Sequence, residues 1–301
     1  NIGLGNFSLQ SNTTGGFNVG IGYNALCSNT TNNGLIAIGH ESLKNFNNNT
    51  QDGAIAIGYN ALYSNTTGIG NLAIGQMAMR CNDVGSYNTA IGYQAMYNTN
   101  TSAGSYNTAH GYQALYNNTT GEKNTAIGYQ SMYANTTGEY NAAIGTDSLR
   151  SNTIGQQNVA LGHNSLYCNT EGFGQVAAGY KTLFNNTTGN YNVGLGAYAL
   201  EFNTTGSCNV ALGYCSLNCN TTGQYNVAVG FETLLCNTTG VCNIAIGYQA
   251  GRNAPAPTRG VYIGMCSGYS DCSASFGALT SVGTFSGQCN TTGYWNAFYG
   301  Y

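Results

Sequence analysis

Apolar and small residues recur along this chain at a fixed spacing. A unit close to Val-Ala-Ile-Gly-Tyr-x-Ala-Leu-x-x-Asn-Thr-Thr-Gly-x-x-Asn begins at Ile2 and occurs eighteen times, at intervals of 17 residues apart from three of 19. We number the positions of each unit from 1 at the Val. Position 4 is Gly in every unit, and position 8 is Leu or Met in the first fourteen. The chain is therefore a repeat protein.

The period predicts an all-β fold, a parallel β-solenoid built from 17-residue coils with about 17 rungs. Seventeen residues are too few for a helical repeat, which needs roughly 33 or more. Apolar positions 1 and 3 alternate with a small position 2, the pattern of a strand with one buried face. We therefore expect positions 1 and 3 to lie in the core together with the Leu of position 8. Asn-Thr-Thr-Gly predicts a turn, and stacked coils predict ladders of identical residues.

The regularity changes near the C-terminus. Residues 1–253 hold regular solenoid repeats, whereas residues 254–301 hold degenerate coils with loop insertions, which we expect to belong to the same solenoid. Both prolines, Pro255 and Pro257, lie there, and they predict a protruding loop in place of a regular turn. Neither end of the sequence shows a capping unit, which favours a longer chain or end-to-end pairing of copies.

Composition agrees with a chain that turns often and carries little charge. Only 6% of residues are charged, against about 25% in ordinary domains, while Gly occurs 44 times and Pro twice. The seven Lys and Arg residues are scattered, so nucleic acid is not an expected partner. Apolar runs fall short of the roughly 18 residues of a membrane span, so we expect no membrane insertion by this segment.

The string Asn-[Val/Thr]-Ala-Ile-Gly, as at residues 124–128, and its variant Asn-Ile-Ala-Ile-Gly at residues 243–247 resemble the head repeats of YadA-like trimeric autotransporter adhesins. They are also similar to repeats in tail-fibre proteins of phages and large viruses. The resemblance extends over nearly the whole chain, although the unit here is longer by an added Asn-Thr-Thr-Gly turn. It implies a left-handed parallel β-roll, often a homotrimer, that serves in surface attachment.

These features favour a non-enzymatic structural or adhesive fibre segment, extracellular, on a cell or virion surface. The expected partners are copies of the chain itself, as a homotrimer or an end-to-end filament, and surface carbohydrate or protein. Two alternatives stay open. The paired Thr of positions 12 and 13 suggest an ice-binding solenoid, and some β-helices are carbohydrate-active enzymes, which would need an acidic cluster.

Catalytic and metal chemistry finds little support. The three histidines, His40, His110 and His163, share no neighbourhood with a carboxylate and a nucleophile, and His110 replaces an expected core Ile. The turns carry Asn and Thr instead of the repeated Asp of calcium-binding solenoids, and the cysteines lack paired Cys-x-x-Cys spacing. We expect no catalytic residues, no metal and no cofactor.

Three sets of residues remain as candidate sites. Stacked Tyr at position 5 (Tyr93, Tyr112, Tyr129) form a candidate contact ladder, with plain ladder packing or a seam between chains as the alternative. Cys219 and Cys236 share position 10 of adjacent coils, within reach of a disulfide, with small buried thiols as the alternative, and Cys266 and Cys272 could close a local loop. Position 11 carries glycosylation sequons that are also good turn chemistry: Asn65, Asn118, Asn135, Asn186, Asn203, Asn220 and Asn237.

Overall fold

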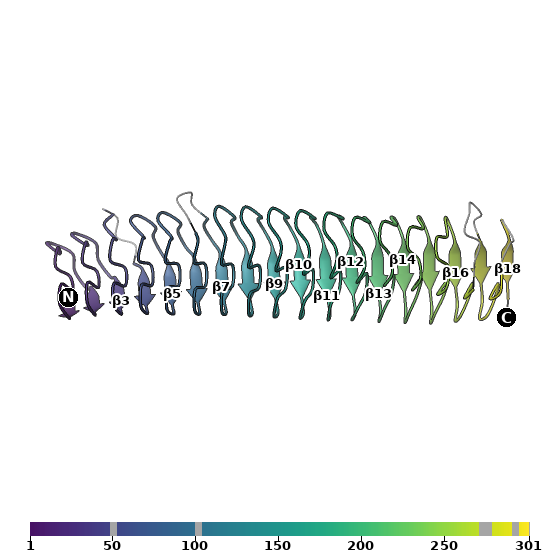
Figure 1. Ribbon diagram of the computed structural model, residues 1–301, viewed down its shortest axis with the longest axis horizontal. Coiled ribbons are helices and arrows are strands. Elements are labelled where there is room, and N and C mark those ends of the chain that lie inside the picture. The colour runs from purple at the N-terminus through teal and green to yellow at the C-terminus, as the bar shows by residue number, and fades with distance from the viewer. Residues whose placement is uncertain (49–52, 100–103, 271–278, 291–294, 301) are drawn as a thin grey trace. The chain divides into compact units, whose positions relative to one another are not determined.

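The computed structural model describes residues 1–48, 53–99, 104–270, 279–290 and 295–300. As the repeat predicts, it is an all-β parallel solenoid in which each coil contributes one strand of three residues, at positions 1 to 3 (Figure 1). The chain forms two compact units, Asn1–Ile154 and Gly155–Tyr301. This division falls within the regular repeats. Cys272 and its expected loop with Cys266 lie outside the described residues.

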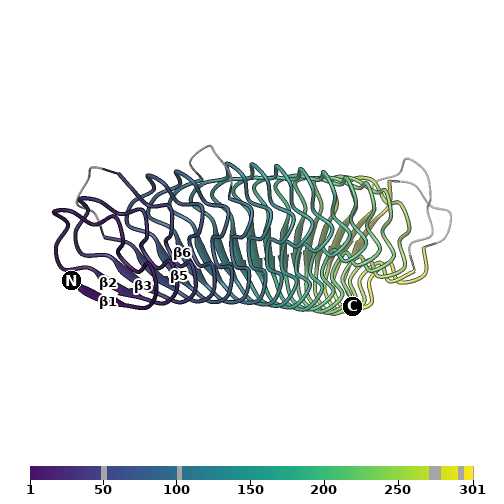
Figure 2. The ribbon, with the colours of Figure 1, turned by 60° about the vertical axis from the view of Figure 1, so that its left-hand side comes forward.

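In the first unit, each strand pairs in parallel with the next one along the chain, and equivalent positions face each other, as Val19 faces Ile36 (Figure 2). Spacing in the repeat therefore translates directly into register. The strands are β1 Ile2–Leu4, β2 Val19–Ile21, β3 Ile36–Ile38, β4 Ile55–Ile57, β5 Leu72–Ile74, β6 Thr89–Ile91, β7 Thr108–His110, β8 Thr125–Ile127 and β9 Ala142–Ile144.

The second unit repeats this arrangement, with parallel pairs of equal register such as Val210 beside Val227. Its strands are β10 Val159–Leu161, β11 Val176–Ala178, β12 Val193–Leu195, β13 Val210–Leu212, β14 Val227–Val229, β15 Ile244–Ile246, β16 Val261–Ile263, β17 Thr280–Val282 and β18 Ala297–Tyr299. The degenerate coils thus continue the same ladder from β15 to β18.

The proline segment does not protrude as expected. Pro255 and Pro257 occupy the places of a regular turn, where their carbonyl oxygens accept hydrogen bonds from the N–H groups of Thr238 (2.8 Å) and Val241 (3.1 Å). To stack on the preceding coil, a turn must offer carbonyl oxygens that accept hydrogen bonds from the backbone N–H groups of that coil. Proline retains its carbonyl and loses only its own donor, so it can stand in this turn.

The expected orientation of the strand side chains is wrong. The small residue at position 2 points inward and is fully buried, as Ala126 and Ala211 are, whereas positions 1 and 3 point outward. His110, at position 3, is accordingly exposed and does not lie in the core. The interior is narrow, and it is filled from the opposite side by the residues at positions 7 and 8, such as Ser131 and Met132.

The last coils show that positions 2 and 8 share one interior space. Tyr262 replaces the usual Ala at position 2 and is fully buried. Position 8 is Gly in the coil before Tyr262 and in its own coil: a Cβ added at Gly251 would lie 3.0 Å from the Tyr262 ring, and one at Gly268 would collide with it. Phe298 and Gly287 repeat the exchange. A large residue at position 2 therefore requires an empty position 8.

The glycine of position 4 lets the coils stack closely. At Gly128 φ is +135°, a conformation that is essentially open only to glycine, and an added Cβ would collide with the carbonyl oxygen of Gly145 in the next coil. The corner that follows uses left-handed residues with side chains, as at Gln130 (φ 48°) and Met132 (φ 52°). Backbone geometry and coil spacing thus both require Gly at this position.

Two buried ladders of asparagine close the coil. At position 17, the side-chain oxygen of Asn209 accepts from the backbone N–H of Asn226 (3.0 Å), and its amide donates to the carbonyl of Gly223 (2.8 Å). At position 11, the amide of Asn220 donates to the side-chain oxygen of Asn203 (2.7 Å). Both ladders lie inside the coil and supply partners to backbone groups that would otherwise be unsatisfied.

Candidate functional site

The outward strand face carries an apolar strip in each unit, which we define as the first and third residues of the strands, and which Thr108 and His110 interrupt in the first unit. Several of its third residues are more than a third exposed, among them Ile127 (36%) and Ile144 (43%) in the first unit and Ile246 (42%) in the second, whereas others are half-buried. Most members are Val, Ile, Leu or Thr, and none is Asp, Glu, Lys or Arg. Large exposed apolar surfaces of this kind mark interaction sites.

The aromatic column of position 5 borders this strip. The rings of Tyr93 and Tyr112 lie 5.3 Å apart at 11°, and those of Tyr112 and Tyr129 lie 5.2 Å apart at 8°. His40 takes its place between two tyrosine rings in the same way, with centroids 5.2 Å from each. The predicted ladder therefore exists.

The stacking limits what this column can contact. Each ring face of Tyr112 is covered by a neighbouring ring, so only the ring edges and the hydroxyl groups face outward. Stacking of a sugar ring on an aromatic side chain requires an open ring face, which Tyr112 does not offer. Geometry thus favours ladder packing, or a seam bordering the apolar strip, over carbohydrate stacking at Tyr93, Tyr112 and Tyr129.

The candidate glycosylation residues lie on the wrong side of the coil for a glycan. All seven are fully buried in the position 11 ladder: Asn65, Asn118, Asn135, Asn186, Asn203, Asn220 and Asn237. The amide of Asn135, for example, donates to the side-chain oxygen of Asn118 (2.7 Å) and to the carbonyl of Gly138 (3.1 Å). A glycan on this nitrogen has no room inside the coil, so these sequons are turn and ladder chemistry in the folded chain.

The cysteines of the described residues are free thiols. Cys219 and Cys236 occupy equivalent places in adjacent coils but form no disulfide in this structure, so the structure favours the alternative of small, partly buried thiols. Burial raises the pKa of the Cys219 thiol, which lowers the fraction present as the reactive thiolate.

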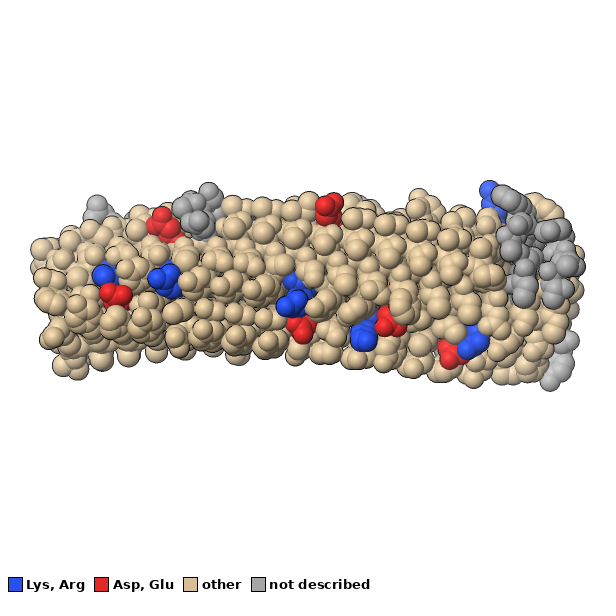
Figure 3. Space-filling view, viewed as in Figure 1, with Lys and Arg blue, Asp and Glu red and all other residues tan. Residues whose placement is uncertain are grey.

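On the face shown in Figure 3, charged side chains stand singly or in pairs of opposite charge on an otherwise uncharged surface. Lys44 contacts Glu41 at 2.8 Å and Arg252 contacts Glu232 at 2.7 Å. The hydrogen bond from Lys44 holds the pKa of Glu41 below its usual value, and Arg252 does the same to the pKa of Glu232. Carboxylates held ionised by a cation suit a structural role better than that of a general acid.

The threonines of the turn face two directions. The hydroxyl of Thr119, at position 12, donates to the carbonyl of Thr136 in the next coil (2.9 Å), whereas Thr120, at position 13, is exposed. The two threonine columns therefore do not form one flat array, which an ice-binding surface would need. Over the described ranges, no three or more His, Cys, Asp or Glu side chains gather where they could hold a metal ion.

Comparison with known proteins adds no assignment: no family model, no curated protein and no solved structure matches the chain. Among the residues that the structure describes, no helix is long and apolar enough to span a bilayer. Among the surfaces described above, the apolar strip recurs along both units.

Proposed function

We propose that this chain is a non-enzymatic structural and adhesive fibre segment that associates with copies of itself through the apolar strip. The carrying observation is that the strand face presents exposed or half-buried Val, Ile or Leu side chains in every regular coil except that of Thr108 and His110, and holds no Asp, Glu, Lys or Arg. A sheet face that meets water normally carries polar side chains, which protect it from association. This face lacks such protection, as expected of a surface that is covered in use.

A second copy of the chain is the occupant that fits best. The strip repeats at the spacing of the coils, about 4.8 Å, because equivalent residues of adjacent strands lie in register. Side chains of a partner can match every coil only if they repeat at the same spacing. Another solenoid of the same sequence provides that match along its whole length, and it provides an uncharged, apolar surface in return.

The energetics require many coils. Full burial of an Ile or Leu side chain contributes about 1.5–3 kcal/mol, so covering one that is about 40% exposed contributes roughly 1 kcal/mol. Association costs on the order of 4–15 kcal/mol in lost freedom of the partners. One coil cannot offset this cost, whereas the nine strands of a unit together can. The regular repetition of the strip is therefore what makes association favourable.

The resemblance to YadA-like head repeats supports a homotrimer as the assembly and an extracellular position on a cell or virion surface. The scarcity of charge is consistent with a chain that covers much of its surface with other copies. A repeated fibre also multiplies weak contacts to a target surface, because each additional contact becomes intramolecular once the first is made.

Sedimentation velocity tests this proposal. Ile38→Lys, Ile127→Lys and Ile144→Lys combined place three charges on the apolar strip, and Thr67→Lys, Thr120→Lys and Thr137→Lys combined place the same charges on exposed turns of the same unit. We expect the original chain and the turn variant to sediment as oligomers and the strip variant as a monomer with an unchanged circular dichroism spectrum. A monomeric original chain, or a strip variant that still associates, would contradict the proposal.

A further inference from the structure

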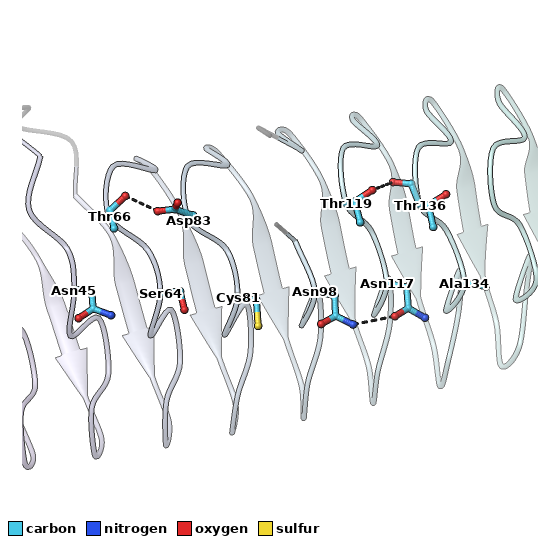
Figure 4. Close-up of a pocket in the computed structure, with 10 residues that line it drawn as sticks. All are labelled: Asn45, Ser64, Thr66, Cys81, Asp83, Asn98, Asn117, Thr119, Ala134 and Thr136. Atoms are coloured by element: carbon cyan, nitrogen blue, oxygen red, sulfur yellow. Dashed lines mark hydrogen bonds between the residues drawn. The ribbon is translucent and has the colours of Figure 1, made fainter. Parts of the chain in front are cut away.

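A polar groove runs along the first unit between the side chains of positions 10 and 12 (Figure 4). It has a volume of about 730 Å³ and crosses six successive coils. Its lining consists of small side chains, mostly amides and hydroxyls, with one carboxyl group, one thiol and one alanine: Asn45, Ser64, Thr66, Cys81, Asp83, Asn98, Asn117, Thr119, Ala134 and Thr136.

The repeat itself produces this groove. The side chain of position 11 points into the coil, as the fully buried Asn65, Asn118 and Asn135 show. The side chains of positions 10 and 12 point outward and form the two walls of the groove, and the backbone of position 11 forms its floor. In these coils position 10 is Asn, Ser, Cys or Ala, which leaves the space open. The second unit places Phe202 at the same position, which shows that a large side chain can be accommodated there.

Hydrogen bonds hold the lining side chains in place. The amide of Asn98 donates to the side-chain oxygen of Asn117 (2.9 Å), and the hydroxyl of Thr66 donates to Asp83 (2.5 Å). An asparagine amide offers two donors and two acceptor lone pairs, and a carboxylate offers about four acceptor sites. Each of these amide and carboxyl groups makes one of these hydrogen bonds, so it can form further hydrogen bonds with a ligand in the groove.

We propose that the polar groove binds an extended, uncharged glycan. A linear polysaccharide presents hydroxyl groups at regular intervals along its length, and the groove presents amides, hydroxyls and the Asp83 carboxylate at the regular spacing of the coils. Hydrogen bonds to an ionised acceptor such as Asp83 are the stronger kind. Six coils extend over roughly 24 Å at about 4.8 Å per coil, which is the length of several sugar residues.

Other extended polymers fit less well. The lining contains no Lys or Arg, so a nucleic acid or an acidic polysaccharide would find no cation for its charges. An extended peptide binds most favourably by adding a strand to an open sheet edge, where its backbone groups are paired. The groove walls are side chains of two columns, which suits a ligand that carries its donors and acceptors as hydroxyl groups.

Calorimetric titration of the full chain with soluble oligosaccharides tests the proposal. The probes are 1,4-linked oligomers of glucose, N-acetylglucosamine, mannose and xylose, from two to eight sugars. We expect at least one series to bind, with affinity that rises with length and then levels off once the oligomer fills the groove. Absence of binding in every series, or affinity independent of length, would overturn the proposal, as would preferential binding of extended peptides.

Matched variants locate the site. Cys81→Phe fills the groove, and Cys168→Phe places the same side chain at position 10 of the second unit. Likewise, Asn98→Ala with Asn117→Ala removes groove amides, and Asn185→Ala removes a position 10 amide elsewhere. We expect the groove variants to weaken binding about tenfold or more, as loss of one or two hydrogen bonds predicts, and the control variants to bind normally. Equal effects of both sets would overturn the assignment.

This proposal rests on the adhesive part of the proposed function and uses none of the residues of the apolar strip. Failure of glycan binding with intact self-association would therefore refute the groove alone. Loss of self-association with intact glycan binding would refute the assembly alone.

Discussion

Replacing Asn209 by alanine tests whether the inward asparagine ladder stabilises the solenoid. Asn209 is fully buried, and its side-chain oxygen accepts from both the backbone N–H and the side-chain amide of Asn226 (3.0 and 3.1 Å). Its own amide donates to the carbonyl of Gly223 and to the side-chain oxygen of Asn192 (2.8 and 3.1 Å). Alanine removes all four bonds and leaves a space behind.

The expected loss follows from these contacts. A buried N–H deprived of its acceptor costs about 1–3 kcal/mol, and this applies to the backbone N–H of Asn226. The carbonyl of Gly223 suffers less, because the amide of Asn220 still donates to it (3.1 Å). With the unfilled space included, we expect the free energy of unfolding to fall by roughly 2–4 kcal/mol.

Urea unfolding followed by circular dichroism measures this loss, and Asn185→Ala is the control. Asn185 is partly exposed and makes one side-chain bond, to the carbonyl of Glu201 (3.1 Å), so its removal should cost about 0.5–1 kcal/mol. If Asn209→Ala costs no more than Asn185→Ala, the ladder does not contribute as argued.

Asn209→Asp distinguishes the role of this side chain as a hydrogen-bond acceptor from its role as a donor. The carboxylate still accepts from Asn226, but when ionised it faces the carbonyl of Gly223 with no proton to donate. Burial should raise the pKa of this carboxyl above its unfolded value of about 3.9. The variant should therefore be most stable below that value, where the protonated group can donate, and should lose stability as pH rises through the folded pKa. Stability that increased with pH would refute the reasoning.

Three further predictions concern other features. Gly128→Ala should lower the free energy of unfolding by more than the roughly 1–3 kcal/mol of backbone strain, measured in urea, because the new Cβ also collides with the next coil. Arg252 lowers the pKa of Glu232, so this ion pair should stabilise the fold above the unfolded pKa near 4.5, and the stabilisation should be lost as pH falls through the folded pKa. Glu232→Gln should remove this part of the acid dependence of the free energy of unfolding, about 0.5–1 kcal/mol. Maleimide should modify exposed Cys242 faster than Cys219, whose pKa burial raises, as peptide mapping after brief labelling would show.

The sequence was sufficient to predict the coil, its period and its register, because glycine at position 4 and asparagine at position 11 each satisfy a backbone requirement that recurs in every coil. It was insufficient to predict which face of each strand points into the core. Alternation of apolar and small residues shows that two faces differ, but either face can be the inner one when the interior is narrow enough for alanine.

One signal within the sequence indicates which face of the strand points inward. Position 8 becomes glycine at Gly268, in the coil where position 2 becomes the large Tyr262, and at Gly251, in the coil before it. Such an exchange of volume is expected only between residues that share an interior. The polar groove gives no comparable signal, because the side chains at positions 10 and 12 vary from coil to coil.

Photo-crosslinking tests most directly whether the outward strand face is the surface of assembly. A benzophenone amino acid is placed at Ile127 on the apolar strip or, in a matched variant, at Thr137 on an exposed turn of the same unit. If copies of the chain meet through the strip, irradiation should give covalent oligomers from position 127 and monomers from position 137. Monomers from position 127, or equal crosslinking at both positions, would contradict the account.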